Sequence, residues 1–229
     1  MKNNNHEGNI NKKCLKARYV RKHTPVSDKR GKEGKREYLI IQSKPKQRMQ
    51  NQQLSNKRPW SLKEVSQFLA VADKEGKGLL YDFTLSTGLR LEEVLALPWF
   101  NVDLKQGTVT VSRSVSFFLN GGADLSTSRS HHRTISLPPS LVEKMKKHKE
   151  EQNEIKQRLR EDYRHGLDLV FPRMDGGLRN PSSIRFQLYR LIEKANLWQI
   201  NFHELRNIHE SRLVQSGAHP QFIQERLGR

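Results

Sequence analysis

The distribution of charged and apolar residues divides this chain of 229 residues at Pro59. Residues 1–58 contain 17 Lys or Arg and 4 Asp or Glu, so they hold +13 of the formal net charge of +18. They are rich in Asn, Gln, Ser and Lys and poor in branched apolar residues, and such a segment buries too little surface to offset the entropy lost on ordering. The sequence therefore predicts a flexible basic arm over residues 1–58 and one folded domain over residues 59–229.

The excess of basic residues indicates a polyanionic partner. Each phosphate neutralised by Lys or Arg releases condensed counterions, which makes nucleic acid the most common partner of such a chain. An anionic membrane surface, a ribosomal location or a simple contribution to solubility is also compatible with the charge. Composition alone leaves these alternatives open.

Hydropathy and cysteine content indicate the compartment. The sequence has no apolar run long enough to cross a bilayer and no signal-peptide pattern at its start, so neither a membrane-spanning nor a secreted protein is expected. Cys14 is the only cysteine, which excludes an internal disulfide and fits the reducing cytoplasm. A zinc protease is not expected, because His203, Glu204 and His209 lack the His-Glu-x-x-His spacing that places two imidazoles on one helix face.

Helix signals begin directly after Pro59. Ser61 and Glu64 have the spacing of a capping box, and apolar residues then recur every three or four positions up to Ala72. A short helix is expected over residues 91–97, where Pro98 ends it. Four further helices are expected to start near Leu141, Pro181, Leu205 and Pro220.

Strand signals occupy the middle of the folded part. Apolar and polar residues alternate over residues 108–111, residues 116–118 continue as an extended segment, and residues 133–137 form a third strand that ends at Pro138. We therefore expect an α+β fold, in which a mainly helical domain carries a small antiparallel three-stranded sheet.

Two arginines lie beside the starts of predicted helices. Arg90 follows a turn that ends at Gly88 and Leu89, and Arg206 lies just after His203 in an amphipathic segment. An arginine in this position can bind a phosphate through two parallel hydrogen bonds, while backbone amides add further donors. Singly, each is more typical of a structural ion pair, and Glu93 lies one turn beyond Arg90 as a ready partner.

Four short motifs follow one another in the folded part of the chain. They are Thr-Gly-Leu-Arg-x-x-Glu ending at Glu93, Arg-Thr-Ile at 133–135, His-x-Leu-Arg at 203–206 and Glu-Arg-Leu-Gly at 225–228. In this order they resemble the catalytic domain of the tyrosine recombinases, the phage-type integrases. The resemblance runs from Trp60 to Arg229, about three quarters of the chain, and four motifs together are far more specific than one.

The resemblance implies a site that binds the scissile phosphate of double-stranded DNA. Arg90, His203 and Arg206 match the family's phosphate-binding catalytic residues, Glu93 has a supporting place, and Arg229 stands where the family has a His or Trp. Members of the family form a covalent 3′-phosphotyrosine and need no metal and no nucleotide cofactor. The implied partners are DNA and other recombinase protomers.

Departures from the family pattern indicate an incomplete catalytic site. The family's lysine falls within Ser126-Thr127-Ser128, and the nearest cation, Arg129, is a poor proton donor. The family's nucleophilic tyrosine follows the Leu-Gly motif, beyond the last residue here, and only the basic arm stands where the family has a core-binding domain. We therefore expect a truncated catalytic domain that does not cleave DNA alone.

Three functions follow from these observations. The first is a DNA integrase or site-specific recombinase, bacterial or phage-encoded and associated with the nucleoid in the cytoplasm, that is catalytically incomplete. The second is a non-catalytic DNA-binding module that competes at recombination sites. The third is a basic RNA-associated protein whose motif matches are accidental, and it requires Arg90 and Arg206 to lie far apart.

Overall fold

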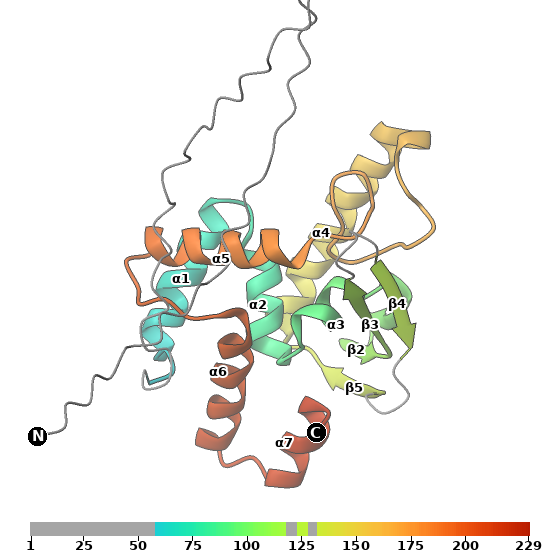
Figure 1. Ribbon diagram of the computed structural model, residues 1–229. Helices are drawn as coiled ribbons and strands as arrows, with labels where there is room; N and C mark the ends of the chain where they lie inside the picture. The colour runs from blue at the N-terminus through green and yellow to red at the C-terminus, as the bar shows by residue number, and fades with distance from the viewer. Residues whose placement is uncertain (1–57, 118–122, 128–131) are drawn as a thin grey trace, which may run out of the picture. The chain divides into compact units, whose positions relative to one another are not determined.

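The structure is a computed structural model that describes residues 58–117, 123–127 and 132–229. The basic arm predicted over residues 1–58 lies outside these ranges except for Arg58. Within them, three helices are followed by five short strands and then by four more helices (Figure 1). The mainly helical α+β fold is thus confirmed.

The first and third helices begin close to their predicted starts. The first three helices are α1 (Leu62–Lys74), α2 (Gly78–Thr87) and α3 (Leu91–Leu95). The predicted capping box is present in α1: the Glu64 amide donates to Ser61 Oγ at 3.3 Å, and the Ser61 amide donates to the Glu64 carboxylate at 2.7 Å. Helix α3 is two residues shorter than expected.

The sheet prediction is confirmed in outline and corrected in its strands. A three-stranded antiparallel sheet has the order β1-β2-β5, formed by β1 (Val102–Asp103), β2 (Thr108–Val111) and β5 (Arg133–Ser136). The segment predicted at 116–118 does not belong to it. That segment overlaps the end of β3 (Arg113–Phe117), which pairs with β4 (Ala123–Thr127) in a separate two-stranded sheet.

The last four helices account for most of the C-terminal half. They are α4 (Pro139–Leu159), α5 (Pro181–Lys194), α6 (Phe202–Gln215) and α7 (Pro220–Leu227). Asn180 caps α5 as predicted, because its side chain accepts a hydrogen bond from the Ser182 amide at 2.8 Å. Helix α4 has 21 residues, but most of them are charged or polar. None of the helices in the described ranges is long and apolar enough to cross a bilayer.

Helix α2 lies at the centre of the core, in contact with α1, α4 and α6 (Figure 1). Most of its residues are buried, which explains why its apolar residues are not confined to one face. Aromatic rings connect it to α1: Phe68 packs edge-on against Tyr81 with centroids 5.3 Å apart, and Trp60 lies 5.2 Å from Phe68. This packing fixes the position of the α2 C-terminus, from which the chain enters the candidate site.

Candidate phosphate-binding site

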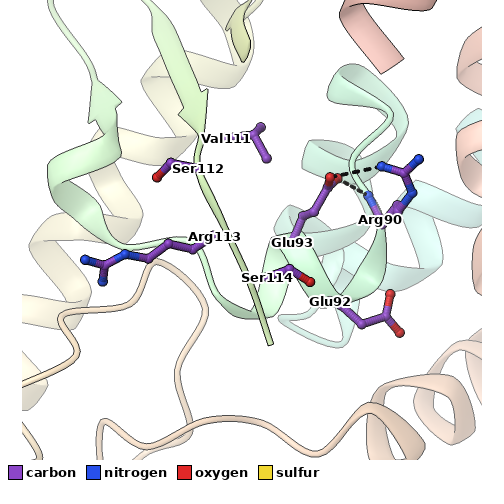
Figure 2. A pocket seen from close by; sticks show the side chains of 7 residues that line it. All are labelled: Arg90, Glu92, Glu93, Val111, Ser112, Arg113 and Ser114. Carbon is purple, nitrogen blue, oxygen red and sulfur yellow. Dashed lines mark hydrogen bonds and ion pairs between the residues drawn. The ribbon is translucent and has the colours of Figure 1, made fainter. Parts of the chain in front are cut away.

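Arg90 is positioned by the sharp junction between α2 and α3. Gly88 ends α2 in the left-handed region at φ +70°, and Arg90 takes the extended N-cap position of α3. The Arg90 amide donates to Glu93 Oε2 at 2.8 Å, and Arg90 Nη1 donates to Glu93 Oε1 at 3.2 Å. Figure 2 shows these side chains facing each other, while Arg113 points away from them. The Arg113 guanidinium carbon lies 4.9 Å from the centroid of the Phe100 ring.

Arg206 and His203 are positioned by the N-terminal end of α6. Asn201 caps this helix: the Glu204 amide donates to Asn201 Oδ1 at 3.1 Å, and the Asn201 amide donates to the Glu204 carboxylate at 2.6 Å. His203 lies exposed in the first turn. Arg206, one turn further, is buried with only 1% of its surface exposed.

The buried guanidinium of Arg206 is held by backbone oxygens. Its Nη1 donates to the Gly88 carbonyl at 2.8 Å and its Nη2 donates to the Leu227 carbonyl at 2.7 Å. Its buried Nε has no hydrogen-bond partner among the described residues. A buried donor without an acceptor is costly, so this N–H is suited to an anionic oxygen entering the site.

Arg90, His203 and Arg206 line one hollow of about 390 Å³. Arg90 comes from the start of α3 and the other two come from α6, so residues more than a hundred positions apart converge. This placement contradicts the hypothesis of accidental motifs, which requires Arg90 and Arg206 to lie far apart. Arg185, paired with Glu92 at 3.2 Å, adds a further cation to the lining.

The charges at the site remain positive at neutral pH. Burial, followed by the nearby charge of Arg90, lowers the pKa of Arg206 to about 10, which still leaves it protonated. Burial by itself would raise the pKa of Glu93, but hydrogen bonds and charge from Arg133 outweigh it, and the net result is a lowered pKa. Glu93 is therefore ionised and pairs with both Arg90 and Arg133. Arg206 has no carboxylate partner among the described residues.

Arg133 has a place at the site that its motif did not reveal. Its Nη1 and Nη2 donate to the two oxygens of Glu93 at 3.0 and 2.9 Å, and its Nε donates to the Arg226 carbonyl at 2.9 Å. The available signal was its position on β5, where it shares the inward face with Ile135. A charged residue on the buried face of a strand needs a buried partner.

His209 and Arg226 form a second buried polar contact beside the hollow. Arg226 Nε donates to His209 Nε2 at 3.1 Å, so the imidazole proton lies on Nδ1 and is donated to the Leu85 carbonyl at 2.9 Å. Burial, followed by the charge of Arg226, lowers the pKa of His209 to about 4. His209 is therefore neutral at pH 7.

Arg229 lies close enough for its charge to lower the pKa of Arg206, but its side chain turns to a carboxylate. Its Nη1 and Nη2 donate to the carboxylate of Glu210 on α6 at 2.6 and 2.9 Å, and it does not line the hollow. Of the segment matched to the family's lysine, Ser126 lies on β4, whereas Ser128 and Arg129 fall outside the described residues. The catalytic role of Arg229 stays a prediction.

Comparison with known proteins identifies the family. The Phage integrase family model matches residues 60–229. The ICEBs1 integrase of Bacillus subtilis is 27% identical over 174 residues, which cover 74% of this chain and 46% of that protein. The prophage integrase IntR of Escherichia coli is 28% identical over 203 residues, covering 82% and 49%. The chain thus spans about half the length of the curated relatives it matches.

Solved structures show the same fold. The Tn1549 transposon integrase in complex with transposon right end DNA superposes with a TM-score of 0.67 at 17% identity, covering 76% of this chain and 58% of that one. XerH bound to its difH substrate gives a TM-score of 0.56 at 23% identity, covering 75% and 47%. Since the family match extends from Trp60 to Arg229 and the fold agrees with these recombinases, this chain belongs to the phage integrase family of tyrosine recombinases.

Proposed function

We propose that this chain acts in DNA integration and recombination by binding double-stranded DNA, with one backbone phosphate held in the hollow of Arg90, His203 and Arg206. The observation that carries the proposal is the convergence of these three side chains from two distant segments. The relatives support it, because two are named integrases and the Tn1549 and XerH structures contain DNA. Such a protein acts with DNA in the cytoplasm.

The donors of the hollow suit a phosphate. Arg206 uses two of its five N–H bonds on carbonyls, and its Nε has no partner among the described residues. Arg90 adds a second guanidinium, and His203 lies where its ring can donate to another oxygen. Donors fixed in advance around a phosphate stabilise the negative charge that grows during phosphoryl transfer.

Other recombinase protomers are the second proposed partner. XerH has also been solved with a palindromic difH substrate, at a TM-score of 0.54. A palindrome offers two equivalent half-sites, and two copies of one protein occupy such a site symmetrically. We therefore propose that protomers of this chain bind DNA in pairs.

Strand cleavage by this chain alone is not part of the proposal. Three tyrosines lie in the described ranges: Tyr81 and Tyr163 are buried, Tyr189 is on the outer face of α5, and none of them lines the hollow. Incubation with a nicked half-site duplex is expected to give no covalent adduct on a denaturing gel. An adduct would show that this chain cleaves DNA by itself.

The binding proposal is tested with a duplex that the full chain itself selects from a randomised pool. We expect Arg90→Ala to weaken binding to this duplex about tenfold and to make the dependence of log K on log salt shallower by about one, because one phosphate contact is lost. Arg164→Ala is the matched control, since Arg164 is exposed and pairs with Asp175. Equal binding of all duplexes, or equal effects of the two substitutions, would contradict the proposal.

A further inference from the structure

The C-terminal end of α7 is bound by three arginines from three different parts of the fold. Each donates to one of three consecutive carbonyl oxygens, which belong to the last turn of α7 and its cap. The contacts are Arg133 Nε to Arg226 at 2.9 Å, Arg206 Nη2 to Leu227 at 2.7 Å and Arg90 Nη2 to Gly228 at 3.3 Å. Two of these arginines line the proposed phosphate hollow, and the third does not.

Helix chemistry explains why arginines gather at this end. The last carbonyls of a helix have no partner within the helix and carry the negative end of its dipole, so guanidinium groups satisfy them well. Figure 1 shows α7 beside α6, and α7 contacts both α6 and β5. The end of α7 thus lies where side chains from these elements meet the start of α3.

Arg133 connects this end of α7 to the opposite wall of the site. One edge of its guanidinium reaches the Arg226 carbonyl, and the other side binds both oxygens of Glu93. Glu93 in turn accepts from the amide and the guanidinium of Arg90. The side chain of Arg133 is only 7% exposed, so it acts on Arg90 from behind the hollow.

Gly228 packs closely against the same guanidinium group of Arg133. Its φ of +67° lies in the left-handed region, and a Cβ at this position would meet Arg133 Nη1 at 2.8 Å and Arg133 Cζ at 3.2 Å. The close approach allows Arg133 to reach the Arg226 carbonyl while its other nitrogens remain on Glu93. Gly228 therefore serves the contact as well as the helix end.

We infer that Arg133 is a positioning residue, which orients the phosphate-binding donors of Arg90 and Arg206 by holding Glu93 and the end of α7 in register. The inference rests on the proposed function, because it concerns the donors of the same hollow. Arg133 makes no contact with DNA in this account. Its five donors match a carboxylate and a carbonyl at once, which the single ammonium group of a lysine does not.

The test is the substitution Arg133→Lys in the full chain, measured on the selected duplex. Net charge is unchanged and Glu93 keeps a cationic partner, yet we expect affinity to fall about tenfold and the salt dependence to become shallower by about one, as for Arg90→Ala. A purely structural role would lower the melting temperature and leave the salt dependence of the folded protein unchanged. That result would overturn the inference.

A second variant approaches the contact from α7. Gly228→Ala places a methyl group against the Arg133 guanidinium and is expected to change the salt dependence in the same direction. If Arg133→Lys does not fold, Gly228→Ala alone tests the positioning role of Arg133. An unchanged salt dependence in Gly228→Ala would then overturn the inference. Arg164→Lys is the matched control for an exchange of arginine for lysine outside the site.

Failure of the inference is separable from failure of the proposed function. If Arg90→Ala changes the salt dependence and both Arg133→Lys and Gly228→Ala leave it unchanged, the phosphate site stands and the positioning role is wrong. If Arg90→Ala leaves it unchanged, the phosphate site itself is wrong, and the positioning role is overturned with it.

Discussion

His209 is a buried imidazole whose neutral form is required by its neighbours. It accepts from Arg226 and donates to the Leu85 carbonyl, and its pKa of about 4 lies well below the value near 6.5 of an unfolded histidine. Between these two values the unfolded chain binds the extra proton and the folded chain does not. Protonation of His209 therefore favours unfolding.

We expect the free energy of unfolding to be fully retained above pH 6.5 and to fall as the pH drops toward 4, by up to about 3 kcal/mol from His209. Urea denaturation at a series of pH values measures this change. The matched variant is His209→Gln, whose amide offers one donor and one acceptor at every pH. His148 also has a pKa lowered by burial, so a loss of stability that is identical in both proteins would assign the effect elsewhere.

The sequence predicts the positions of some residues of the site but not the contacts of others. Arg90, His203 and Arg206 belong to short motifs, and the structure places all three in the lining of one hollow. The ion pair between Arg133 and Glu93 joins residues 40 positions apart, so no local sequence pattern predicts it. Only the fold brings β5 to α3.

At the scale of elements, the junction between α2 and α3 is packed without spare room. A Cβ on Gly88 would meet His209 Cδ2 at 2.7 Å and Leu227 Cδ2 at 2.8 Å. The glycine thus allows α2, α6 and α7 to approach closely at the point where the chain turns toward Arg90. A change here affects the packing of three helices together.

We expect Gly88→Ala to destabilise the protein by about 1–3 kcal/mol more than Gly76→Ala. Both glycines have positive φ, at +70° and +64°, so the cost of the left-handed backbone is similar. Gly76 has nothing within 4 Å of the added methyl group, whereas Gly88 has two side chains in its way. Equal midpoints in urea denaturation would contradict the packing argument.

Helices were easier to predict than strands for a physical reason. Caps and apolar spacing mark each helix locally, as in Ser61 and Glu64 for α1 or Asn180 for α5. Strand β1 has only two residues, too few for a period of two to show, and its assignment depends on pairing with β2. The same dependence on pairing separates β3 and β4 from the three-stranded sheet.

At the scale of the whole molecule, most of the net charge lies outside the family domain. Residues 1–58 hold +13 of the +18 charge, whereas the phosphate hollow lies in the family domain. Contacts of lysine with phosphates carry no sequence information by themselves. The two parts are therefore expected to contribute differently to DNA binding.

We expect the combined substitution of Lys12, Lys13 and Lys16 by Gln to weaken binding to selected and unrelated duplexes by the same factor. The ratio of the two affinities should stay unchanged, and the salt dependence should become shallower for both. Fluorescence anisotropy titrations at three salt concentrations measure these quantities. A loss confined to the selected duplex would show that these lysines contribute to sequence preference.

The central claim is that Arg90 and Arg206 hold one particular DNA phosphate, and neutralising phosphates one at a time tests it most directly. Each phosphate of the selected duplex is replaced in turn by an uncharged methylphosphonate, and affinity is measured for the wild-type chain and Arg90→Ala. We expect one position on each half-site where the replacement weakens wild-type binding but has almost no further effect on Arg90→Ala, because both changes remove the same contact. Additive losses at every position would contradict the account.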